Sequence, residues 1–103
     1  MSYDYELILV NPGGIIEDDL GNQIPVEPST LPVLCRLQSV GRNEFYNAAA
    51  NGMRPEMVFI IHALEYSGQQ VVKYNGITYR VIRTYQTDTE EIELTCERVT
   101  ADG

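Results

Sequence analysis

The chain has 103 residues, of which 44% are hydrophobic, and it carries a formal net charge of −8. A chain of this length forms one domain with a modest core, and its apolar content excludes wholesale disorder. The charge is uneven: residues 1–35 hold six acids and no base, residues 36–85 carry +3, and residues 86–103 carry −5. With one lysine and six arginines, the chain lacks the clustered cations that bind phosphates. We therefore expect no measurable affinity for duplex DNA at physiological salt.

The start of the chain does not have the basic and apolar pattern of a signal peptide, and no apolar run approaches the ~20 residues that span a bilayer. We therefore expect a protein made and kept in the cytoplasm, or incorporated from there into something larger, with no membrane partner. Cys35 and Cys96 lie about sixty residues apart without a CxxC spacing. Reduced core thiols are expected, and a disulfide would require neighbouring strands.

Residues 1–32 predict an acidic hairpin. The segment YELILV (residues 5–10) has the pattern of a strand, and two turn clusters, NPGG and EDDLGN, follow it. Residues 23–26 are expected to return as the other arm. Prolines at positions 25, 28 and 32 place this arm at an edge or make it irregular, because proline cannot donate a ladder hydrogen bond. The following strand, LPVLCRLQSV, turns Val33, Cys35 and Leu37 to one face.

Residues 41–54 predict one short helix inserted between strands, within SVGRNEFYNAAANGMRPE. Phe45, Ala48 and Ala49 share a helical face that we expect to dock on the strands. Gly52 suits the turn after the helix, and Pro55 requires the helix to end before it. The remaining face has the aromatic, arginine and amide side chains typical of protein interfaces. The candidate subunit-interface, partner-interface or channel-lining residues are Arg42, Asn43, Tyr46, Asn47, Asn51 and Arg54. A solvated helix with no partner remains the alternative.

The second half of the chain predicts further antiparallel strands. MVFIIHALEY (residues 57–66) is apolar on both faces, as in a central strand. Residues 71–85 predict a hairpin closed by Asn-Gly at 75–76, with Tyr74 opposite Ile77 and Val72 opposite Tyr79. EIELTCERV alternates an inward set (Ile92, Leu94, Cys96) with an outward set (Glu91, Glu93, Thr95, Glu97). We predict a mainly β fold: a small antiparallel β-barrel of about six or seven strands with one short α-helix inserted.

Residue types that carry chemistry are few. His62 is the only histidine and lies within FIIHAL, where a packed or sheet-edge position is expected. Two acidic clusters, one of Glu17, Asp18 and Asp19 and one of Asp88, Glu90 and Glu91, lack the ligand pattern of an EF-hand and are expected to be solvated loops that contact partners. No nucleophile–base, zinc or phosphate-loop spacing is present. The sequence predicts no catalytic, cofactor-binding or metal-binding residue, and no enzyme.

The tyrosines give no better evidence of a base-stacking surface. Tyr74, Tyr79 and Tyr85 occupy strand positions where packing in the core or across strands is expected, and the negative charge opposes nucleic-acid binding.

Four segments together resemble a known family. VGRNEFYNAAANGMRPE, then VFIIHA, then KYNGITYRVIRTY and finally EIELTCE are similar in type and order to the head-closure (head–tail adaptor, or stopper) proteins of tailed bacteriophages. The resemblance covers roughly residues 33–99, and the turn at residues 18–22 fits it less specifically. It implies a small β-barrel with one helix that forms a homo-oligomeric ring, dodecameric or hexameric, in the neck of the virion. The ring closes the portal channel after DNA packaging.

The resemblance also implies partners. These are other copies of the chain, a portal-side adaptor and a tail-completion or tail-terminator protein, with genomic DNA passing through without specific binding. It further implies that residues 41–55 face a neighbouring subunit or the channel. Two alternatives stay open: a tail-completion or tail-terminator ring at the same junction, and a small-barrel nucleic-acid-binding module.

Overall fold

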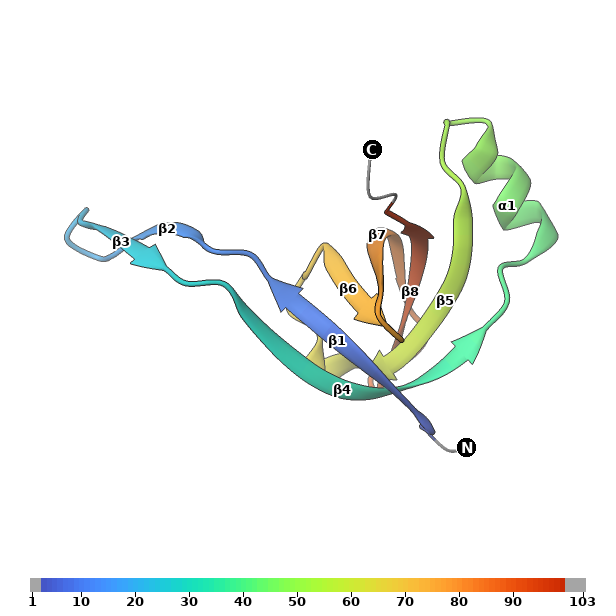
Figure 1. Cartoon of the computed structure of the whole chain (residues 1–103), viewed down its shortest axis with the longest axis horizontal. Coiled ribbons are helices and arrows are strands. Elements are labelled where there is room, and N and C mark those ends of the chain that lie inside the picture. Colours follow the sequence, from blue (N-terminus) through green and yellow to red (C-terminus); the bar gives the residue numbers. More distant parts are fainter. Residues whose placement is uncertain (1–2, 100–103) are drawn as a thin grey trace.

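Six strands close into an antiparallel barrel in the order β1–β4–β5–β8–β7–β6 (Figure 1). A computed structural model of the chain describes residues 3–99. The barrel strands are β1 (Tyr5–Asn11), β4 (Ser29–Gln38), β5 (Pro55–His62), β6 (Val71–Tyr74), β7 (Ile77–Gln86) and β8 (Glu91–Arg98). Closure comes from a non-local pair, because β1 lies between β4 and β6 with Leu9 opposite Val72. The predicted mainly β barrel with one short helix is confirmed.

The core fills the inside of this barrel with the alternate residues of each strand. Leu7 and Leu9 of β1 and Leu94 and Cys96 of β8 have no exposed surface. Phe59 lies at the centre, with its ring centroid 5.4 Å from that of Tyr74 and 5.3 Å from that of Tyr79. The inward pattern predicted for β8 is confirmed. Tyr79 is a core residue, whereas Tyr85 is exposed near the end of β7.

The β6–β7 hairpin has the predicted turn and register. Val72 pairs with Tyr79 and Tyr74 pairs with Ile77. Asn75 has φ 53° and Gly76 has φ 78°, the left-handed conformations that a two-residue type I′ turn requires.

A second, two-stranded sheet extends the β1–β4 pair outside the barrel. It consists of β2 (Gly14–Glu17) and β3 (Gln23–Val26), with Ile16 opposite Ile24. We call residues 12–28 the arm. It projects along the longest dimension of the molecule, which is 48 Å (Figure 1). Residues 3–99 therefore contain eight strands, two more than the barrel. The hairpin expected at residues 1–32 continues beyond that boundary, because β4 pairs with β1 up to Cys35.

Prolines occupy the edge positions that the sequence predicts. Pro25 lies in β3, whose only partner is β2. Pro32 lies in the part of β4 that pairs with β1 alone, because β5 pairs with β4 only at residues 36–38. In both places a partner strand lies on one side only, so the missing proline N–H does not interrupt hydrogen bonds to a second strand.

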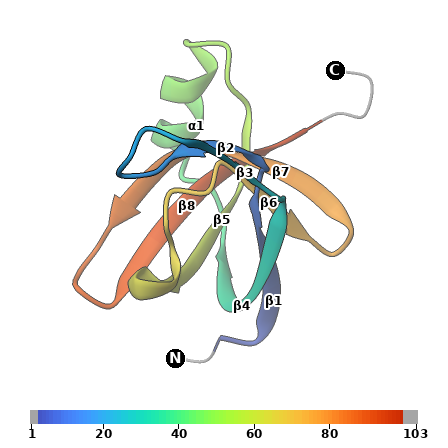
Figure 2. The ribbon, with the colours of Figure 1, turned by 90° about the vertical axis from the view of Figure 1, so that its left-hand side faces the viewer.

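The inserted helix, α1 (Arg42–Ala49), is shorter than the predicted range of residues 41–54. Gly52 follows it with φ 79°, as expected for a turn that ends a helix. The predicted docking face is right for Ala48 but wrong for Phe45, which is 41% exposed, and for Ala49, which is also exposed; no residue of α1 is fully buried. Glu44 and Ala48 are the half-buried side chains that turn towards the barrel. Figure 2 shows α1 standing beside the barrel strands rather than plugging them.

Two further sequence expectations need correction. The strand predicted for residues 57–66 ends at His62, and the 3-10 helix η1 (Ala63–Glu65) follows it. His62 is exposed at that strand end, with its ring 4.4 Å from the ring of Tyr3. Thr95 points outward from β8 as predicted, but it is only 5% exposed because α1 covers it.

Both cysteines are buried and free, on strands β4 and β8. Strand β5 separates β4 from β8 in the barrel, so the two thiols do not lie on neighbouring strands. Among residues 3–99, no helix has the length and apolar content needed to cross a membrane.

Candidate functional site

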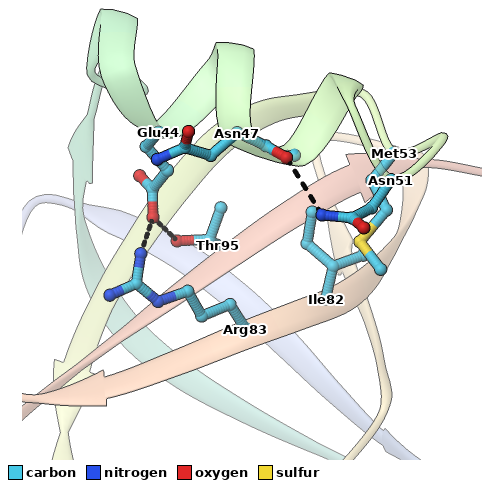
Figure 3. Close-up of a pocket in the computed structure, with 8 residues that line it drawn as sticks. Glu44, Asn47, Asn51, Met53, Ile82, Arg83 and Thr95 are labelled. Atoms are coloured by element: carbon cyan, nitrogen blue, oxygen red, sulfur yellow. Dashed lines mark hydrogen bonds and ion pairs between the residues drawn. The ribbon is translucent and has the colours of Figure 1, made fainter.

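Helix α1 lies across the outer face of β7 and β8, and an ion pair connects it to the barrel (Figure 3). Arg83 Nη1 of β7 lies 2.7 Å from Glu44 Oε2 in the first turn of α1. Thr95 Oγ1 of β8 donates a longer hydrogen bond, 3.4 Å, to the same oxygen. A β-bulge at Val81–Arg83 makes this geometry possible, because it places Arg83 opposite the outward-facing Thr95. Glu44 is also well placed near the positive N-terminal end of the helix.

A pocket of about 230 Å³ lies between α1 and these strands. Its lining is mostly polar at the helix side and mixed at the strand side (Figure 3), and consists of Glu44, Asn47, Ala48, Asn51, Met53, Ile82, Arg83 and Thr95. The Asn51 amide nitrogen donates to the backbone oxygen of Asn47 at 3.1 Å. The Glu44 carboxylate in this pocket is paired with Arg83 and accepts a hydrogen bond from Thr95. The groups left to contact a ligand are therefore the side-chain amides and this neutral ion pair.

The predicted interface residues fall into two groups. Arg42, Asn43 and Tyr46 are exposed to solvent, as expected. Asn47 and Asn51 are exposed too, but they line the pocket between α1 and the strands (Figure 3). The set is therefore not one continuous face of the helix.

Arg54, the remaining predicted interface residue, lies at a second groove, on the other side of α1. This groove has a volume of about 430 Å³ and is lined by Phe45, Gly52, Arg54, Pro55, Glu56, Glu97 and Arg98. The backbone N–H of Arg54 donates to Glu97 Oε1 at 3.2 Å. Glu97 also pairs with Arg80, and Arg98 pairs with Glu56 at 3.1 Å. Phe45 is thus part of an open groove rather than of the core.

The two acidic clusters contain turn-forming carboxylates. Asp18 Oδ1 accepts hydrogen bonds from the backbone N–H groups of Asn22, at 2.8 Å, and Leu20, at 2.9 Å. These bonds, that from Asn22 first, hold the pKa of Asp18 below its usual value. Asp88 accepts in the same way from Glu90 and then Glu91, which lowers its pKa too. Glu17, Asp19 and Glu90 remain exposed.

Glu91 belongs to a cluster that the sequence did not reveal. Its carboxylate accepts a short hydrogen bond from the Tyr3 hydroxyl and two bonds from Arg36 Nη2, both 2.8 Å. The hydrogen bond from Tyr3, followed by that from Arg36, lowers the pKa of Glu91, while the same carboxylate raises the pKa of Tyr3. Arg36 also lies 5.7 Å from the Tyr3 ring centroid. The cluster fastens the N-terminal segment across β4 and β8 and is structural.

The arm is the second candidate surface that the sequence did not predict, because the sequence indicated a hairpin but not that both of its faces are exposed. All eight residues of β2 and β3 are exposed, and Leu20 at the tip is 86% exposed. Ile15 lies on one face of this ribbon, and Ile16 lies with its partner Ile24 on the other. The positions of the isoleucines in the sequence indicate apolar side chains on both faces of the ribbon. They do not indicate whether another part of the fold covers those faces.

Within residues 3–99, no three His, Cys, Asp or Glu side chains come together in a way that would hold a metal ion. No family model matches this chain, and no curated protein matches it. The candidate functional surfaces are therefore defined by geometry alone: the arm at one end of the molecule and α1 with its two grooves at the other (Figure 1).

Proposed function

We propose that this chain is a structural assembly protein that forms a homo-oligomeric ring at the head–tail junction of a tailed bacteriophage. The ring closes the portal channel after DNA packaging and provides a platform for the tail. The observation that carries this proposal is the exposure of apolar side chains at two separate ends of one small barrel, at the arm and around α1. Surfaces of this kind mark interaction sites on soluble proteins.

The arrangement of the barrel supports an assembly role over catalysis. The barrel interior is filled by side chains such as Phe59, Leu94 and Leu7, each with no exposed surface. The two grooves beside α1 are open and are bordered by ion-paired residues. The sequence resemblance of residues 33–99 to head-closure proteins agrees in fold class with the six-stranded barrel and its inserted helix.

The charge supports passage of DNA without binding. The net charge of −8 repels phosphates at distances up to a Debye length, which is about 8–10 Å at physiological salt. Four of the six arginines, at positions 36, 80, 83 and 98, already pair with glutamates. In this proposal the protein is assembled in the host cytoplasm into the virion neck, between a portal-side adaptor and a tail-completion or tail-terminator protein.

The test is replacement of Arg42 and Tyr46 by alanine in the phage or prophage that encodes the chain. Both side chains are exposed, so the monomer should fold normally. We expect full-sized heads that lose their DNA and finished tails that remain separate, seen by electron microscopy. Leu64→Ala is the matched control, because Leu64 is 96% exposed and lies in η1, outside α1.

Normal genome retention and tail joining in the double variant would refute the proposed role of α1. Co-purification with tail-tube protein, in place of portal and adaptor, would assign the ring to the tail side of the same junction. Duplex-DNA binding with a sub-micromolar dissociation constant would instead support a nucleic-acid-binding module.

A further inference from the structure

The arm exposes apolar side chains that no part of residues 3–99 covers. It is a two-stranded ribbon beyond the end of the β1–β4 pair, and side chains on both of its faces are exposed to solvent, as at interaction sites. Ile15 is 68% exposed, Ile16 55% and Leu20 86%. The outer edges of β2 and β3 pair with no other strand among the described residues. Side chains and backbone together present an element ready to bind another protein surface.

The arm is also strongly acidic. Residues 12–28 hold four acids, Glu17, Asp18, Asp19 and Glu27, and no base, which is a formal charge of −4. Two arms that paired with one another would bring like charges together, which disfavours an arm-to-arm dimer. The complementary surface must therefore be apolar with positive charge at its border.

The α1 end of the molecule has this character. Phe45, Tyr46 and Met53 are exposed there, at 41%, 63% and 37%. Arg42 is the first residue of α1 and Arg54 follows the end of the helix, and neither forms an ion pair with the described residues 3–99. The groove beside Phe45 and Arg54, about 430 Å³, falls in the size range of ~300–1,000 Å³ typical of ligand pockets. It has room for aliphatic side chains of the kind that the arm exposes.

The two surfaces cannot meet within one molecule, because the arm and α1 lie at opposite ends of the barrel (Figure 1). Contact between them requires two copies in a head-to-tail arrangement. Such heterologous contacts produce a ring when the rotation between copies closes.

We propose that the arm of one copy docks on the α1 surface of the next, with Leu20 near Tyr46 and Phe45 and the acidic arm beside Arg42 and Arg54. The occupant of each α1 surface is a second copy of this chain. That these contacts close into a ring depends on the proposed function, whereas the contact between two copies does not.

Disulfide trapping tests this contact in the full chain. Cys35 and Cys96 have no exposed surface, so introduced cysteines are the reactive thiols among the described residues. Equal amounts of L20C and Y46C proteins are mixed at high concentration under mild oxidation, which accumulates even weak contacts covalently. We expect heterodimers from this pair in large excess over the matched pair L20C and L64C, because Leu64 is fully as exposed as Leu20 but lies outside α1.

A charge exchange distinguishes specific docking from random collision. R42E with R54E in the Y46C copy should lower the heterodimer yield roughly two- to thirtyfold, the range that two exposed ion pairs are worth. E17K with D19K in the L20C copy should restore it. Asp18 is left unchanged because it forms the turn at the tip.

Equal yields from the Y46C and L64C pairs, or no heterodimer from either, would overturn the proposal. So would a predominance of L20C homodimers, which would indicate arm-to-arm pairing, or no effect of the charge exchange. The outcome is independent of the phage experiment on Arg42 and Tyr46. Docking without a neck phenotype would refute the proposed role of α1 in the neck alone, and a neck phenotype without docking would assign the arm to a different protein.

Discussion

Replacement of Glu44 by glutamine should loosen α1 while leaving the barrel intact. The helix has eight residues and buries none of them fully, and a helix of this length is unstable alone. Its connection to the barrel is concentrated in the Glu44 carboxylate, which pairs with Arg83 and accepts from Thr95. Glutamine keeps the size and part of the Thr95 hydrogen bond but loses the charge.

The size of the effect follows from two contributions. The Glu44–Arg83 pair is exposed on the arginine side, at 60%, so its loss costs about 0.2–1 kcal/mol. Removing a negative charge from the first turn costs a further ~0.3–1 kcal/mol at the helix dipole. Together these reduce the free energy of local opening by about 0.5–2 kcal/mol, which is roughly a two- to thirtyfold loss of protection.

Hydrogen exchange at the backbone amides of α1 measures this directly. Phe45 N–H donates to the Gly41 oxygen and Ala50 N–H to the Tyr46 oxygen, so both report helix opening. Arg83→Gln should give a smaller loss, because it leaves the Glu44 charge at the helix start. Arg80→Gln is the matched control: Arg80 is similarly exposed on the same strand but pairs with Glu97. Unchanged exchange in Glu44→Gln, or an equal loss of protection in the barrel strands, would refute this account of how α1 is held.

Three further predictions concern the barrel. Phe59→Ala should destabilise the fold by about 3–5 kcal/mol in urea unfolding, because it removes a fully buried ring; a loss below ~1 kcal/mol would contradict the assigned core. Glu91→Gln should cost about 1–2 kcal/mol at neutral pH. Since the folded pKa of Glu91 lies below its ordinary 4.5, this stabilisation is present above that pH and is lost as the pH falls through the folded pKa. The variant and the natural protein should therefore converge in stability under strong acid, and a constant difference would contradict it. Burial raises the pKa of Cys35 to about 11 and that of Cys96 to about 12, so a thiol reagent at pH 8 should react with both only after unfolding.

Local signals in the sequence predicted the elements that depend on neighbouring residues. The Asn75–Gly76 turn determines the register of β6 against β7, because the turn type aligns the two strands. The inward positions of β8 follow from strict alternation. Closure of the barrel between β1 and β6 depends on contacts between distant residues, and the sequence predicted it only as a way to cover strand edges.

The candidate site was less predictable, for three physical reasons. Two turns of helix do not have enough residues to show which stripe is buried, so Phe45 was placed on the wrong face. The bulge at Val81–Arg83 reverses the alternation that would have placed Arg83 inside with Val81. The Arg36–Glu91 pair joins residues 55 positions apart, beyond any local pattern. The arm was recognised as a hairpin, but its lack of a covering layer depends on the whole fold.

Strand β4 runs from one candidate surface to the other. It leaves the arm at Ser29, passes from β1 to β5 at residue 36, and is separated from α1 by only three residues. Ten residues of extended chain measure about 33 Å. If copies dock as proposed above, β4 would be the one continuous strand between the two contacts of each molecule, so its contour length would limit how far apart those contacts lie.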